Sequence, residues 1–138
     1  RALALLAEGL ARQGQLGLAR EPAERARALA GRSDDSELQV VVTTSLARVN
    51  EAAGIVKGPE AHLQPAITQA GKLGLVPAGL EARWTLGAIQ SATAAERSAG
   101  LQVLAAVRRE AALRGFKLMA QRAEAALKTA TLGARPLG

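Results

Sequence analysis

The segments TLGAIQ (residues 85–90) and AGLQVLAAV (residues 99–107) decide the fold that we predict for this chain. A leucine followed by a small residue recurs at an interval of forty positions, as Leu6-Ala7, Leu46-Ala47 and Leu86-Gly87. A fixed period of this kind is typical of stacked helical hairpins, in which each hairpin buries its apolar face against the next. We therefore predict an all-α fold, a right-handed α-solenoid of three helical hairpins plus a C-terminal capping helix, with about seven helices.

Apolar residues at helical spacing indicate where these helices lie. We expect one domain over residues 1–128, followed by a flexible tail at 129–138. Its predicted parts are three hairpins at about 2–31, 34–75 and 77–114 and the capping helix at 116–128. The first helix would present Leu3, Leu6, Ala7 and Leu10 on one face. In the second helix, Pro22 fits best in the first turn, which places the start of the regular helix near Glu21.

Three local patterns leave alternatives open. Val40–Thr44 favours a strand by propensity, but the helical spacing of apolar residues predicts a helix over about 36–53. Asp34 with Glu37 has the spacing of a helix-capping box, and with Asp35 the same residues are also a candidate cation site. Pro65 lies inside the helix that begins at Pro59, where we expect a kink. In the longest helix, the predicted inward-facing residues are Leu101, Leu104, Val107 and Ala111.

The composition excludes several kinds of site. The chain has no cysteine, which excludes disulfides, zinc thiolate sites and thiol nucleophiles. It has one tryptophan, one phenylalanine and no tyrosine, whereas β-sandwiches and barrels are enriched in aromatic residues. No apolar run is long enough for a membrane span. A chain without cysteine suits either redox compartment, and we expect a cytoplasmic protein. Because the chain begins with Arg1 rather than methionine, we interpret it as a processed chain or a fragment.

Positive charge is concentrated in the last third of the chain. The formal net charge is +6, and it comes entirely from residues 97–138. A basic patch is predicted there, formed by Arg108, Arg109, Arg114, Lys117 and Arg122. Such a patch favours nucleic acid or another anionic surface as a partner. The alternative is that these side chains only keep helix exteriors soluble.

The sequence carries no pattern that predicts catalysis. His62 is the only histidine and is expected on the solvated surface. Gly71-Lys72 lacks both the upstream glycine and the following serine or threonine of a phosphate-binding loop. We therefore predict a protein that is not an enzyme and that has no cofactor and no metal.

The hairpins resemble tetratricopeptide repeats in a degenerate form with a period of forty residues. The residues that carry the resemblance are Leu86, Gly87, Ala99, Val103 and Ala106 in the third hairpin and Leu6, Ala7, Leu10, Ala19, Ala23 and Ala26 in the first. The chain is similar to C-terminal repeat regions of bacterial multidomain signalling proteins. The middle hairpin keeps only Leu46 and Ala47, and Asn50 and Gln90 stand where the family has a large residue.

This resemblance implies protein–protein interaction, as a scaffold or regulatory segment of a larger bacterial protein or complex. A partner peptide or helix would bind a concave face lined by the first helix of each hairpin. The residues that the family register assigns to this face are Glu8, Arg12, Thr44, Arg48, Glu51, Glu81, Trp84, Ala88 and Ser91. Trp84 is either an anchor for the partner or a residue that packs between neighbouring helices.

Overall fold

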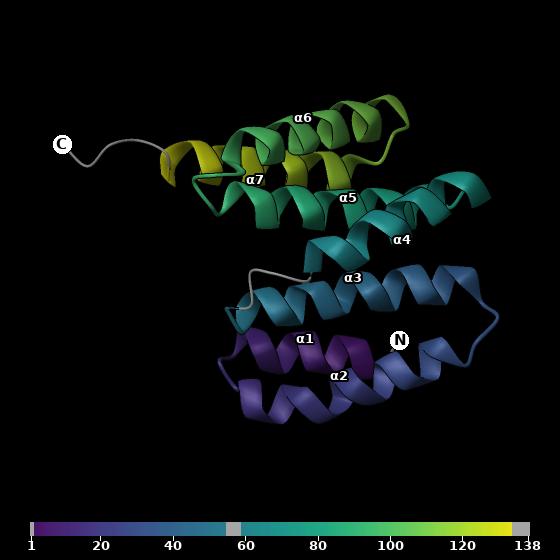
Figure 1. Ribbon diagram of the computed structural model, residues 1–138. Coiled ribbons are helices and arrows are strands. Elements are labelled where there is room, and N and C mark those ends of the chain that lie inside the picture. Colours follow the sequence, from purple (N-terminus) through teal and green to yellow (C-terminus); the bar gives the residue numbers. More distant parts are fainter. Residues whose placement is uncertain (1, 55–58, 134–138) are drawn as a thin grey trace. The chain divides into compact units, whose positions relative to one another are not determined.

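The computed structural model describes residues 2–54 and 59–133. Within these residues the chain forms seven helices and no strand. Figure 1 labels these helices along the chain. The helices are α1 (Ala2–Arg12), α2 (Leu16–Gly31), α3 (Ser36–Ala52), α4 (Pro59–Leu73), α5 (Val76–Ser91), α6 (Arg97–Leu113) and α7 (Lys117–Gly133). The predicted all-α class and the predicted seven helices are therefore confirmed for this part of the chain, while the right-handed solenoid stays a prediction.

The chain divides into two compact units, Arg1–Ala82 and Arg83–Gly138, and the boundary falls inside α5. This division differs from the single domain expected over residues 1–128. The predicted tail also differs, because α7 continues to Gly133 instead of ending near Lys128. The rest of the expected tail, residues 134–138, lies outside the described residues.

The first unit is held together mainly by small side chains. Helix α1 packs against α2 and α3, and α3 also packs against α4. Two clusters of buried residues join α1, α2 and α3: Ala4, Ala26, Ala30, Val42 and Leu46 in one, and Ala7, Ala11, Ala19 and Val49 in the other. Because alanine keeps only a methyl group between helices, the backbones can approach closely, and leucine and valine fill the remaining space.

One member of the repeated pairs lies outside this core. Leu6 is 51% exposed, whereas Leu46 is buried in the first unit. The buried face of α1 runs through Ala4, Ala7 and Ala11, and the helical period turns Leu6 away from it. The prediction that Leu6 is a core residue is therefore wrong, and the first and middle pairs do not have the same surroundings.

The strand alternative for Val40–Thr44 is also wrong, because these residues lie in the middle of α3. Val40 and Val42 are almost fully buried, so tertiary packing overrides their strand propensity. The cap of α3 is Asp35 rather than the predicted Asp34, and its Oδ1 accepts a hydrogen bond from the Leu38 amide at 3.1 Å.

Pro22 does not mark the start of its helix. Helix α2 begins at Leu16 and contains Pro22 in its second turn, so the expected start near Glu21 is wrong. The missing proline N–H leaves one hydrogen bond of the helix unmade. Pro65 lies inside α4, as predicted.

In the second unit, α6 turns a different face inward than the repeat register predicts. Its buried residues are Gly100, Leu104, Val107 and Ala111, whereas Ala99 is exposed and Val103 and Ala106 are half-buried. The buried positions therefore lie one residue after those that the repeat register predicts. The apolar spacing alone predicts three of them correctly, namely Leu104, Val107 and Ala111. A Cβ atom on Gly100 would lie 2.7 Å from the Gly87 carbonyl oxygen and 2.5 Å from the Ser91 nitrogen. Only glycine at position 100 permits this approach of α6 to α5.

Candidate functional site

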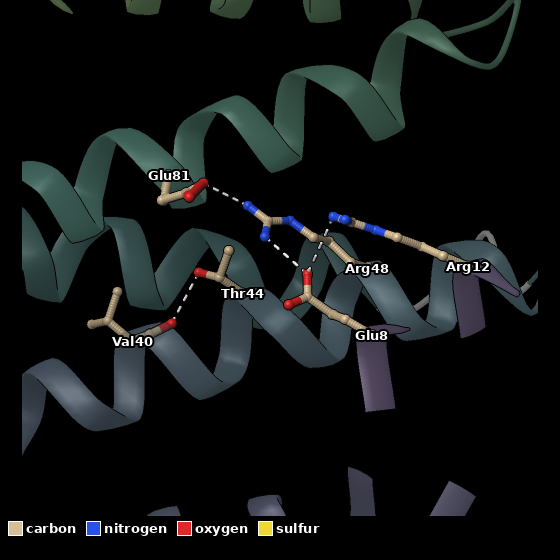
Figure 2. Close-up of polar contacts among 6 residues, drawn as sticks. All are labelled: Glu8, Arg12, Val40, Thr44, Arg48 and Glu81. Atoms are coloured by element: carbon tan, nitrogen blue, oxygen red, sulfur yellow. Dashed lines mark hydrogen bonds and ion pairs between the residues drawn. The ribbon is translucent and has the colours of Figure 1, made fainter. Parts of the chain in front are cut away.

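Four residues of the predicted binding face form one polar network across the first unit, shown in Figure 2. Arg48 of α3 donates hydrogen bonds to Glu8 of α1 at 2.9 Å and to Glu81 of α5 at 2.5 Å. Arg12, one turn beyond Glu8, places its guanidinium 3.9 Å from the Glu8 carboxylate. The structure therefore brings together residues from three helices that are far apart in the chain.

The network is largely withdrawn from water. The side chain of Glu8 is 6% exposed and that of Arg48 is 16% exposed, while Glu81 reaches 36%. Burial lowers the pKa of Arg48, but the hydrogen bond from Arg48 to Glu8 and the charges of Glu81 and Glu8 outweigh burial, so that this pKa is raised. Arg48 therefore remains charged, and it offsets a carboxylate that would otherwise be buried without a partner.

Two other residues assigned to this face use their hydroxyl groups inside their own helices. Thr44 is buried and donates to the Val40 carbonyl at 2.9 Å, as Figure 2 shows. Ser91, in the second unit, is buried and donates to the Ala88 carbonyl at 3.0 Å. Neither hydroxyl is presented to a partner, and we omit both residues from the proposed binding surface.

Glu51 lies at the surface near Arg48. Partial burial of its carboxyl group raises its pKa, and the nearby positive charge of Arg48 opposes that effect. Glu51 therefore adds a partly desolvated carboxyl group to the surface beside Arg48.

Trp84 and Arg122 come together in the second unit, although the sequence analysis assigned them to different surfaces. The Arg122 guanidinium lies 4.3 Å from the centroid of the Trp84 ring, a cation–π contact between α7 and α5. Both side chains are half-buried. This contact favours the alternative in which Trp84 packs between helices.

The remaining residues of the predicted basic patch are exposed. Arg108 and Arg109 lie on α6, Arg114 follows its last turn, and Lys117 begins α7. Arg114 is 3.9 Å from Glu110, which also pairs with Arg83. The patch therefore loses Arg122 to the contact with Trp84 and keeps four exposed cations.

A cleft that the sequence analysis did not predict lies on the other side of α3. It has a volume of about 290 Å³, and α2, α3 and α4 line it. Four of its lining residues are buried and apolar: Ala30, Val42, Leu46 and Ala47. Five polar side chains surround this floor: Arg27, Gln39, Thr43, Asn50 and His62.

The helical period separates the two sides of α3. Because a helix turns by about 100° per residue, Gln39, Thr43 and Asn50 share one side of α3. By the same period, Arg48 lies on nearly the opposite side, and Thr44 and Glu51 are turned about 100° or more away from the centre of that series. The sequence therefore shows a polar edge of α3 at positions 39, 43 and 50, but this pattern by itself does not indicate a cleft.

The cleft has the chemistry of a small recognition site. Its floor is apolar, and its rim offers a guanidinium, an imidazole and two carboxamides. Within the described part of the chain, no acidic side chain lines it. The Gln39 amide already donates to the Ser33 carbonyl at 2.7 Å, which fixes that part of the rim.

His62 is exposed, as predicted, although it also contributes to the rim of the cleft. Among residues 2–54 and 59–133, no group of three histidine or acidic side chains is placed to hold a metal ion. Asp35 is used as a helix cap instead. None of the described helices is long and apolar enough to cross a membrane.

Comparisons with protein-family models, curated proteins and solved structures gave no match for this chain. The resemblance to tetratricopeptide repeats therefore stays a prediction from the residues that carry it.

Proposed function

We propose that this chain is a protein-interaction module, a scaffold or regulatory segment that binds a peptide segment of a partner protein. The observation that carries the proposal is the cleft between α2, α3 and α4, with its buried apolar floor and polar rim. Concave sites of this composition are the usual places where proteins bind ligands. The proposal moves the binding site from the row of Arg48 and Glu81 to the opposite side of α3.

The occupant that fits best is an extended peptide that presents one apolar side chain beside a carboxylate. About 290 Å³ accommodates a single aliphatic side chain over the floor formed by residues such as Leu46 and Ala47. Arg27 supplies a permanent positive charge at the rim, and His62 adds a second nitrogen donor. A carboxylate would therefore gain a charge-assisted hydrogen bond from Arg27.

The charged residues around Arg48, on the opposite side of α3, are a less favourable binding site than the cleft. Arg48 already bonds to Glu8 and Glu81, so a partner at that row would have to replace two existing ion pairs. A partner in the cleft replaces only water over apolar side chains, which is favourable in itself. One buried aliphatic side chain contributes about 1.5–3 kcal/mol, so we expect modest affinity.

The proposal is tested by selecting binders from a library of random peptides displayed on phage, with the folded chain immobilised. Enriched peptides are then synthesised and titrated calorimetrically against the chain and against two variants, Arg27→Gln and Arg25→Gln. Both variants remove one positive charge from exposed positions of α2, but only Arg27 lines the cleft.

We expect enriched peptides to pair an aliphatic residue with an acidic one, and Arg27→Gln to weaken their binding about tenfold or more. Arg25→Gln should leave their affinity unchanged. Failure to enrich any peptide, or equal losses in the two variants, would reject the cleft as a peptide-binding site.

A further inference from the structure

The turn between α6 and α7 exposes several large apolar side chains to solvent. Leu113 is 82% exposed, Leu118 is 77% exposed and Phe116 is 37% exposed, all within six consecutive residues. Single exposed leucines are common on protein surfaces, whereas here three large apolar side chains are exposed at one turn, which makes the turn a candidate interaction surface. We refer to Leu113, Phe116 and Leu118 as the apolar tip.

The backbone of this turn is well defined. Gly115 has φ +80°, and its amide donates to the Ala112 carbonyl at 3.2 Å. The Phe116 amide donates to the Ala111 carbonyl at 2.8 Å, which completes a Schellman motif at the end of α6. Helices α6 and α7 pack against each other on either side of the turn. The apolar tip therefore lies at a well-defined end of the hairpin formed by α6 and α7.

Positive charges surround the apolar tip. Arg114 and Lys117 lie between its members in sequence and are exposed, and Arg109 is one helical turn before Leu113. Residues 97–138 contain only two acidic side chains, Glu110 and Glu124. Glu110 pairs with Arg83 and lies 3.9 Å from Arg114, which offsets its charge.

We propose that the apolar tip docks this chain on anionic lipid bilayers, with Leu113, Phe116 and Leu118 entering the headgroup region while Arg114 and Lys117 contact lipid phosphates. Apolar side chains flanked by lysine and arginine are the combination that binds the membrane interface. This surface belongs to the second unit and is independent of the cleft.

The apolar surface and the charge together favour a bilayer over the other anionic partners. The phosphates of a nucleic acid would pair with the cations but would leave Leu113 and Leu118, the most exposed apolar residues of the tip, in contact with water. An acidic protein would need a matching apolar surface to cover Leu113 and Leu118. A bilayer receives both parts, because its interface is negatively charged above an apolar interior.

The test is sedimentation of the full chain with vesicles of phosphatidylcholine, with and without phosphatidylserine. We expect binding to the phosphatidylserine vesicles, with weak or no binding to phosphatidylcholine alone, and a decrease as salt is added. Arg114→Gln combined with Lys117→Gln should weaken binding about 25-fold, about fivefold for each charge removed.

The apolar contribution is tested with Leu113→Ser combined with Leu118→Ser, for which we expect a loss of about tenfold or more. The matched control is Leu18→Ser combined with Leu29→Ser, which changes two leucines of α2 that are 63% and 54% exposed and should not alter vesicle binding. Circular dichroism checks that each variant stays helical.

The proposal fails if the chain does not bind phosphatidylserine vesicles at low salt. It also fails if the variant at positions 113 and 118 binds these vesicles as well as the natural sequence does. Binding to duplex DNA without binding to vesicles would assign the charge surplus to nucleic acid instead.

Discussion

The two sides of α3 carry polar residues with opposite roles. On one side, Arg48 bonds to Glu8 and Glu81 and holds α1, α3 and α5 together through ion pairs that are largely shielded from water. On the other side, Gln39 and Asn50 border a cleft whose floor is apolar and open. The comparison teaches that a row of charged residues in register across several helices can be an internal connection, while the cleft that we propose as the binding site lies on the other side of α3.

The largest effect is expected on the polar side, for Arg48→Ala. Removing the guanidinium leaves the Glu8 carboxylate, 6% exposed, without its closest cation, and Arg12 at 3.9 Å replaces it only in part. We expect the free energy of unfolding to fall by about 3 kcal/mol, measured by urea denaturation followed by circular dichroism.

Arg32→Ala serves as the control, because Arg32 is exposed beyond the end of α2, and it should change stability by less than about 0.5 kcal/mol. Equal effects of the two substitutions would mean that the network contributes nothing to the stability of the first unit.

In the second unit, α5 and α6 pack closely at Gly100, and this contact is compared with the network around Arg48. Gly100→Ala places a Cβ atom 2.5 Å from the Ser91 nitrogen, so α5 and α6 must separate. We expect a loss of about 2 kcal/mol in the same urea experiment. The control is Gly31→Ala, where a Cβ atom meets nothing within 4 Å; if both substitutions are neutral, the close approach of α6 to α5 is not required.

Replacing both Glu8 and Arg48 with apolar residues tests whether the instability of Arg48→Ala comes from the buried carboxylate that it leaves unpaired. Glu8→Leu combined with Arg48→Met removes the buried charges together, and no buried carboxylate is left unpaired. We expect unfolding free energy within about 1 kcal/mol of the natural chain, well above that of Arg48→Ala. If the double variant is as unstable as Arg48→Ala, the network has a geometric role that apolar packing does not replace.

The smallest effect concerns the pH dependence contributed by Glu51. Its pKa is raised in the folded chain, so the folded state keeps a proton that the unfolded state has already lost. Between the ordinary pKa of glutamate and this raised value, stability therefore decreases as pH rises. Glu51→Gln should remove that decrease, seen as a flatter plot of thermal midpoint against pH. A larger decrease in the variant would contradict the assignment.

The helices could be predicted from the sequence because they depend on local spacing. Apolar periodicity placed α3 correctly despite the strand propensity of Val40–Thr44. Glu8, Arg48 and Glu81, which we assign to one predicted face, lie close together in the first unit. The sequence could not show that these three residues bond to one another, because that depends on how closely the helices approach.

The register of α6 was missed for a related reason. Small residues occur at both positions 99 and 100, and only the three-dimensional contact with Gly87 shows that glycine, not alanine, faces α5. The cleft was missed because its lining comes from three helices, and no single helix pattern distinguishes an open apolar floor from a closed core.

The most direct test of the central claim uses the absence of cysteine from the natural chain to introduce one thiol at a time on each side of α3. Asn50→Cys places a thiol at the cleft, and Glu51→Cys places one about 100° further round the helix, toward Arg48 and outside the residues that line the cleft. The rate of maleimide labelling is measured with and without a peptide selected by the chain. We predict that the peptide slows labelling at position 50 and leaves position 51 unchanged; protection of position 51 alone would place the partner on the side of Arg48 and contradict the account.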